Sequence, residues 1–186
     1  MAAIAWSTIR AALVTWLQGS SATSLGAGKV LWAGQNGVQV QGDHATLRIA
    51  SVTSLGLRDE VQPSTDLGRP AGEEVALTAK AQREFIVSVQ VITAKPVDGA
   101  GTSDAMALAS KARDSLALGS VCAAFDAAGF CVVDPGQLLD VGAVLDSEFL
   151  GRAAFDLRCR TAGEVAEYTG YIATVELIDD LNGYVD

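Results

Sequence analysis

The sequence has few of the side chains on which metal binding and acid–base catalysis usually depend. It holds one histidine among 186 residues, so a His-dependent catalytic triad or a multi-His metal site would have to be built around His44 alone. Its neighbours Asp43 and Thr46 give no metal-ligand spacing. We therefore interpret His44 as a turn or strand-edge residue, and we predict no metal and no cofactor.

Cysteine is also scarce. The three cysteines, Cys122, Cys131 and Cys159, are an odd number and form no CxxC pair, so they match neither a disulfide framework nor a zinc site. Because all three stand among apolar residues, we expect inert, buried thiols in a reducing cytoplasm.

Long apolar runs and basic leader sequences are missing as well. No apolar stretch approaches the roughly 20 residues of a membrane span. Arg10 interrupts the apolar stretch of residues 1–18, and no basic segment precedes it. This pattern argues against a secretory signal.

The sequence has fewer basic than acidic side chains, and the difference is not spread evenly along the chain. The formal net charge is −9, and residues 121–186 hold three basic and twelve acidic side chains. Binding to a phosphate backbone draws most of its affinity from Lys and Arg. We therefore expect no tight binding to DNA and no attraction to an anionic membrane.

The sequence does contain enough apolar material for one core. With 49% hydrophobic residues, a chain of this length fits a single domain over residues 1–186. Apolar side chains recur at three- and four-residue steps from Trp6 to Trp16, which predicts an amphipathic helix over residues 2–18 that Gly19 ends. We expect both tryptophans to pack on the core, with docking onto a neighbouring subunit as the alternative.

The middle of the chain alternates between strand and loop patterns. We predict strands at residues 30–33 and 45–55, separated by a turn-rich segment. Residues 56–81 hold two prolines and many charges, and we interpret them as a projecting hairpin or loop. A central strand is predicted at residues 84–94, because apolar groups occupy parts of both faces.

The second half predicts a helix pair followed by strands. The first helix runs to Gly119, and a short second helical segment ends before Gly129. Apolar residues alternate at 153–160 and again at 171–177, so we predict a strand pair joined through residues 162–170. This order of elements predicts an α+β fold with a mainly antiparallel β-sheet packed against helices on one side.

Two glycine-rich segments partly match phosphate-binding loops. Residues 99–104 follow a predicted strand and open a predicted helix, but Asp104 replaces the third glycine of the dinucleotide fingerprint and would repel phosphate. Residues 26–29 end in Gly-Lys, but Val30 follows where a phosphate-binding loop needs Ser or Thr. We interpret both segments as ordinary loops.

A group of carboxylates could in principle divide acid and base roles in hydrolysis. These residues stand in predicted loops and on the outward phase of strands, which is typical of a solvated face or an interface rim. A small cytoplasmic enzyme or ligand-binding domain, using this group or the loop at residues 98–104, is the second function class. The group consists of Asp140, Asp146, Glu148 and Asp156.

The order of the strand patterns resembles the neck and tail-terminator proteins of tailed bacteriophages. The early part reads Val-Leu-Trp-Ala-Gly-Gln-Asn over residues 30–36 and Ala-Thr-Leu-Arg-Ile over residues 45–49, followed by Asp59-Glu60. A valine-rich strand, an alanine-rich helix and two closing strands continue the resemblance over nearly the whole chain. Residues 37–43 depart from it, because the family tends to carry Pro and Tyr there.

This resemblance implies a structural virion protein at the head–tail junction that is not an enzyme. It would form a ring, in the family a six-fold one, that terminates the tail tube and joins it to the head connector. Its partners would be copies of itself, the tail-tube protein and the head-completion or connector protein, with assembly in the host cytoplasm. DNA would pass through the lumen without tight binding, and no membrane would be involved. A tail-tube or other head–tail joining protein is the close alternative.

The resemblance and the ring that it implies also suggest candidate subunit-interface residues. They are Trp32, Gln35, Asn36, Arg58, Asp59, Glu60, Arg69, Glu148 and Arg152.

Overall fold

The computed structural model describes residues 4–34, 40, 42–55, 60–65, 68, 70, 75–93, 104–145 and 148–169. Its helices are α1 (Trp6–Gln18), α2 (Asp104–Ser115) and α3 (Gly119–Ala127). Its strands are β1 (Val30–Trp32), β2 (His44–Ser54), β3 (Glu60–Thr65), β4 (Val75–Thr93), β5 (Phe130–Pro135), β6 (Leu139–Asp140), β7 (Ala143–Leu145) and β8 (Glu148–Thr169).

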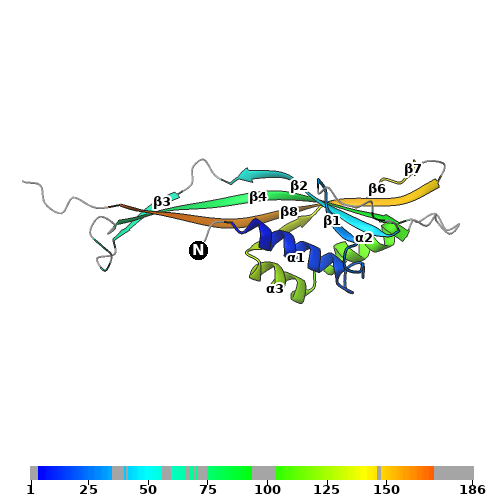
Figure 1. Cartoon of the computed structure of the whole chain (residues 1–186), viewed down its shortest axis with the longest axis horizontal. Helices are drawn as coiled ribbons and strands as arrows, with labels where there is room; N and C mark the ends of the chain where they lie inside the picture. Colours follow the sequence, from blue (N-terminus) through cyan, green and yellow to red (C-terminus); the bar gives the residue numbers. More distant parts are fainter. Residues whose placement is uncertain are drawn as a thin grey trace, which may run out of the picture.

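Two long antiparallel strands, β4 and β8, form the centre of the sheet. β4 has 19 residues and β8 has 22, and they pair without a register shift from Val75↔Thr169 to Thr93↔Gly151. The main path of the sheet is β1-β2-β4-β8-β5, with β3 added to β4 and with β6 and β7 added to β8. At a rise of about 3.3 Å per residue, β8 alone spans about 70 Å, which explains the elongated outline in Figure 1.

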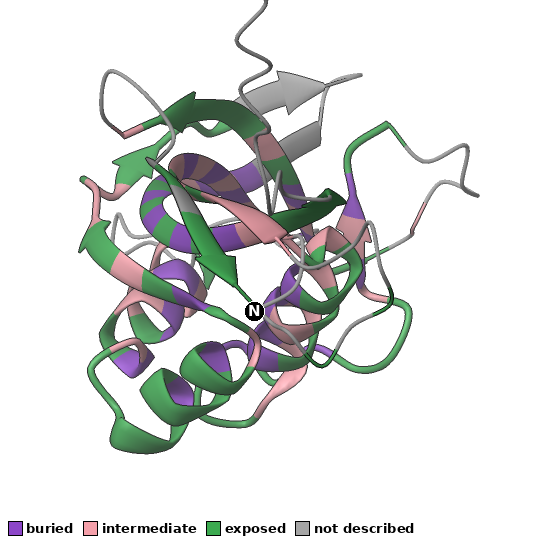
Figure 2. Ribbon diagram, turned by 90° about the vertical axis from the view of Figure 1, so that its left-hand side faces the viewer, coloured by how far each residue is buried: buried purple, intermediate pink, exposed green. Residues whose placement is uncertain are grey.

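The three helices lie on one face of the sheet (Figure 1). On that face, alternate residues of β4 from Phe85 to Val91 and of β8 from Ala153 to Cys159 are buried. Figure 2 shows this alternation as stripes, in which buried residues alternate with half-buried or exposed ones along the strands. The apolar face of each strand therefore meets the apolar faces of the helices, as expected for a two-layer α+β core.

The two tryptophans of α1 connect the helical layer to the sheet and to the other helices. The Trp16 indole Nε1 donates a hydrogen bond to Ser115 Oγ at 2.9 Å, and its ring meets Phe125 edge-on with centroids 5.8 Å apart. Trp6 is half-buried and meets Phe85 edge-on at 5.4 Å. The prediction that these side chains pack on the core is confirmed.

The predicted α+β class is confirmed, with a sheet that is mainly antiparallel. The exception is the pairing of β1 with β2, which is parallel. The helices at 104–115 and 119–127 also correspond to the predicted helix pair. Within the described part of the chain, no helix has both the length and the apolar character that crossing a membrane requires.

Two strand predictions were wrong in extent. β4 begins at Val75 rather than at residue 84, and β8 continues through residues 162–169, where a turn was expected. These extensions contain many Ala, Thr and Glu residues, so their period-two pattern is weak. They are strands because the β4–β8 ladder pairs them residue by residue, which is information that a single segment does not carry. The predicted strand at 171–177 lies outside the described residues.

Candidate assembly surfaces

Past the helices, three strands continue as a ribbon that we call the arm. It consists of β3, residues 75–82 of β4 and residues 162–169 of β8 (Figure 1). Side chains alternate strictly between the two faces along an unbroken ladder. The arm therefore extends both faces of the central sheet, the helix-covered face and the open face.

The arm surface that extends the helix-covered face is mainly apolar, and we call it the apolar arm face. Val61, Ala79 and Val165 form one row across its three strands. Val61 is 57% exposed and Val165 is 63% exposed, whereas Phe85 on the same face of β4 is fully buried. Among the described residues, the apolar side chains on this face are Val61, Pro63, Val75, Leu77, Ala79, Ala81 and Val165.

The boundary between covered and uncovered sheet lies at Gly163. This glycine is buried, and a Cβ added there would lie 2.7 Å from Cγ1 of Ile4, in the residues just before α1. The Ile4 side chain can lie this close to the main chain of β8 only because residue 163 has no Cβ atom. Ile4 thus covers the foot of the arm, and the rows further out begin with Val165.

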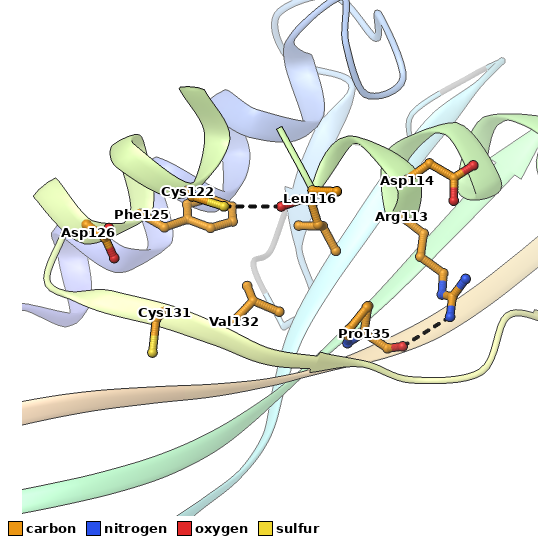
Figure 3. A pocket seen from close by; sticks show the side chains of 10 residues that line it. Arg113, Asp114, Leu116, Cys122, Phe125, Asp126, Cys131, Val132 and Pro135 are labelled. Atoms are coloured by element: carbon orange, nitrogen blue, oxygen red, sulfur yellow. Dashed lines mark hydrogen bonds between the residues drawn. The ribbon is translucent and has the colours of Figure 1, made fainter. Parts of the chain in front are cut away.

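A groove of about 600 Å³ lies between the α2–α3 connection, α3 and β5 (Figure 3). On one wall, Arg113 donates hydrogen bonds to the main-chain carbonyls of Gly136 at 3.1 Å and Pro135 at 3.4 Å. Asp114 and Asp126 also line it. The remaining lining is mainly apolar and consists of Leu116, Ala117, Cys122, Phe125, Cys131, Val132 and Pro135.

The open face of the sheet has a different character, because charged side chains of both signs cross it. Arg160 Nε lies 3.1 Å from Glu84 Oε2, and Arg158 Nη2 lies 3.7 Å from Asp134 Oδ2. Exposed pairs of this kind contribute little to stability, on the order of 1 kcal/mol or less. They make this face compatible with water, in contrast to the apolar arm face.

The structure distributes the predicted interface residues over separate parts of the molecule. Trp32 ends β1 and is only 8% exposed, with the Arg10 guanidinium carbon 4.7 Å from its ring centroid. Arg152 is half-buried in β8 and donates to the side-chain oxygen of Gln90. Their role in an interface stays a prediction. Of the others, Glu60 begins β3 and Glu148 begins β8, whereas Gln35, Asn36, Arg58, Asp59 and Arg69 lie outside the described residues.

The carboxylates considered for hydrolysis do not form a described cluster. Asp140 lies in β6 and accepts a hydrogen bond from the Gly142 main chain at 3.1 Å. Asp156 stands in β8, where it is exposed, and Asp146 lies outside the described residues. Within the described ranges, no three His, Cys, Asp or Glu side chains are grouped so that they could hold a metal ion.

The other segments weighed for chemistry have structural explanations where they are described. His44 begins β2, and its Nδ1 lies 2.8 Å from the Gly42 carbonyl oxygen, which is the predicted turn or strand-edge position. Residues 26–29 form a turn in which the Lys29 main-chain N–H donates to the Gly26 carbonyl. Residues 99–103 lie outside the described part, and Asp104 is the first residue of α2.

The expected burial of all three cysteines was wrong for two of them. Cys159 is buried in β8, and desolvation raises the pKa of its thiol to about 12, with a smaller contribution from Cys131. Cys122 and Cys131 are exposed, because both line the groove beside α3. Cysteines in an apolar sequence context thus occupy two kinds of site. Cys159 lies in the core, whereas Cys122 and Cys131 line an apolar groove.

Comparison with known proteins identifies the family of this chain. The family model described as phage neck terminator protein matches residues 7–185. The chain belongs to the phage neck terminator family. No curated protein matches the sequence of this neck terminator.

Several solved structures match the fold of this neck terminator. One of them is the sheath/tube terminator of the PVC extracellular contractile injection system in its extended state, with a TM-score of 0.50 and 10% sequence identity. The similarity covers 100% of the present chain and 67% of the other chain. At this identity the comparison establishes the fold only.

Family membership confirms the predicted resemblance and gives the neck terminator a structural role in ending the phage tail. For a structural role, the relevant features are surfaces that meet other subunits. The apolar arm face was not among the predicted interface residues. Its only signal in the sequence was a weak period-two placement of Val75, Leu77, Ala79 and Ala81.

Proposed function

We propose that this neck terminator forms a closed ring of six copies, which ends the tail tube and joins it to the head connector. The observation that carries this proposal is the family match over residues 7–185. The uncovered apolar arm face supports subunit contacts, because contiguous exposed apolar surface usually marks a site of protein association. Unlike surfaces that meet head to tail close into a ring when the rotation between subunits allows it.

The charge of the chain supports a lumen through which DNA slides. The net charge of −9 gives no basic run with which to hold phosphates. On the open face, Arg158 and Arg160 each lie beside a carboxylate, so they offer less net positive charge to DNA. We therefore propose that DNA passes without tight binding if this face borders the lumen.

The remaining parts of the proposal follow from the same role. The chain would act as one domain over residues 1–186, without catalytic activity, and would assemble in the host cytoplasm before it becomes part of the virion neck. Its partners would be the tail-tube protein on one side and a connector or head-completion protein on the other. A structural role of this kind needs shaped surfaces and no reactive centre.

Negative-stain electron microscopy combined with mass measurement tests this proposal. The purified protein should be measured alone and with the tail-tube subunits of the same phage. We expect rings of six copies that cap the ends of tubes. A strictly monomeric protein that never caps tubes would contradict the proposal, and growth of long tubes from this chain alone would indicate a tube subunit instead.

A further inference from the structure

The apolar arm face needs a covering surface that the described part of the chain does not supply. Burying a valine side chain stabilises a structure by about 1.5–3 kcal/mol relative to leaving it in water. Val61 and Val165 remain more than half exposed, although they continue the face that the helices cover elsewhere. The opposite face of the arm carries Lys80 and Glu164 in one row, and its other rows mix polar side chains with apolar ones such as Ala166 and Tyr168. It is therefore the less apolar of the two faces.

The groove beside α3 is a second apolar surface on the same chain, and it is concave. Leu116, Phe125, Val132 and Pro135 line it, and its volume of about 600 Å³ leaves room for several apolar side chains. The arm is a narrow ribbon, and the groove belongs to the helix-covered body. One chain thus carries two unlike apolar surfaces, which is the requirement for a head-to-tail contact between identical copies.

One acidic side chain on the arm and one basic side chain on the groove wall have opposite charges, although the carboxylates of Asp114 and Asp126 also line the groove. Glu167 is exposed in the row of Pro63 and Leu77 on the apolar arm face. Arg113 on the groove wall donates to two main-chain carbonyls and has no carboxylate partner among the described residues. An arginine with such a partner at an interface gains a charge-assisted hydrogen bond and contributes to register.

We infer that the apolar arm face of one copy lies in the groove of the next copy, with Glu167 beside Arg113 across the interface. This inference rests on the ring proposed above and identifies one contact that would close it. The contact is heterologous, so each copy contributes its arm on one side and its groove on the other.

The apolar arm face is small for one stable contact, but each subunit of a ring would take part in this contact twice. Eight residues at about 3.3 Å each and three strands about 4.8 Å apart give a face of roughly 350 Å². This is less than the roughly 800 Å² per partner of a standard stable complex. A closed ring compensates, because each copy makes the contact at both its arm and its groove and because closure adds the last contact without a further loss of translational freedom.

The first test compares Val165→Asp with Ala166→Asp, its neighbour on the opposite face of the same strand. Both residues are exposed in the single chain, so both variants should fold. Val165→Asp should raise the concentration of half-assembly at least about tenfold, because it places a carboxylate in an apolar contact. Ala166→Asp should change it by no more than about twofold. Mass measurement would follow assembly. Thermal unfolding would check that each variant folds.

The second test exchanges the charges. Arg113→Glu and Glu167→Arg should each weaken ring formation, and the double variant should recover most of the loss, since it restores an opposite-charge pair. Because Arg113 also holds two carbonyls, Arg113→Gln serves as a second single variant with a smaller effect on the fold. A double variant no better than the worse single variant would overturn the Glu167–Arg113 pairing.

The outcomes separate this inference from the proposed function. If the unmodified protein forms rings and Val165→Asp forms them equally well, the inference is overturned and the ring remains. If Val165→Asp forms normal rings that no longer cap tubes, the arm contacts the tube subunit, which also overturns it. If the unmodified protein never associates, with or without tube subunits, both proposals fail together.

Discussion

The central body and the arm share the two long strands β4 and β8 and differ in what covers them. In the body, Val87 and Leu157 lie opposite each other and are fully buried beneath the helices. In the arm, Ala79 and Val165 lie opposite each other in the same ladder, and Val165 is mostly exposed. The ladder, the alternation and the face are the same in both regions. Hydrogen bonding therefore extends the sheet, whereas the helical layer decides which part of it is a core.

This difference separates folding from assembly. Apolar side chains in the body contribute to the free energy of unfolding of one chain, because folding removes them from water. The exposed side chains of Val61 and Val165 on the apolar arm face contribute little until a partner covers them. In the ring proposed above, each subunit needs a surface of the second kind, and the length of β4 and β8 provides it.

The largest expected effect compares the same substitution in the two regions. Val87→Ala should lower the free energy of unfolding by about 2 kcal/mol, because it removes two buried methyl groups and leaves a cavity. Val61→Ala, on the same face but exposed, should lower it by less than about 0.5 kcal/mol. Urea denaturation of the isolated chain measures both. Equal losses would show that the arm face is already covered within one chain.

A second prediction concerns the bond that ties two helices of the body together. Ser115→Ala leaves the buried Trp16 indole N–H without its acceptor, which should cost about 1–2 kcal/mol. Ser110→Ala on the same helix is the control, because that hydroxyl makes only an exposed contact with Asp114 at 3.4 Å. Thermal unfolding would compare the two. Similar losses in the two variants would mean that the buried hydrogen bond does not explain the effect.

A third prediction tests the boundary between body and arm. Gly163→Ala should destabilise the chain by about 1 kcal/mol, because the new methyl group would overlap the Ile4 side chain. Ile4→Ala removes that side chain, so the double variant should lose less than the sum of the two single variants. A double-mutant cycle of chemical denaturation measures this coupling. Strictly additive losses would show that Ile4 moves aside and does not fix the boundary.

The same boundary explains how far sequence patterns could predict the fold. The helix over residues 6–18 and the core strand from Phe85 onward have strong periodicities, because each packs against an apolar layer and needs apolar residues at fixed steps. Residues 75–82 and 162–169 are held mainly by pairing with each other. Small and polar residues are sufficient there, so their pattern predicts a projecting hairpin or loop for the first segment, which the β3–β4 pairing matches, and a turn for the second.

The candidate surfaces were harder to predict for a related reason. Family resemblance indicated a ring subunit, but an interface is defined by what the fold leaves uncovered. Trp32, one of the candidate interface residues, is buried in the single chain. Val61 and Val165 come from strands a hundred residues apart in the chain, and only their shared row with Ala79 makes them one surface.

The smallest expected effect compares two charged pairs on the open face, one at the end of the body and one in the arm. Glu84 lies opposite Arg160, and Lys80 lies opposite Glu164, in the same ladder. The side chain of Glu84 is only 21% exposed, whereas Lys80 is exposed. Less water around Glu84 should strengthen its Coulomb interaction with Arg160. Glutamine double-mutant cycles should give couplings of about 0.5–1 kcal/mol for Glu84–Arg160 and about 0.2–0.5 kcal/mol for Lys80–Glu164.

Both coupling energies should fall at 0.5 M salt. The fractional decrease should be larger for Lys80–Glu164 in the arm, because exposed charges are screened more effectively. Glutamine preserves the length of each acidic side chain, so the cycle isolates charge from packing at Glu84 and Glu164. A larger coupling in the arm than in the body would mean that cross-strand charges hold the ribbon in place of the missing helical cover. The two regions would then differ in what stabilises them: helical packing in the body and cross-strand charges in the arm.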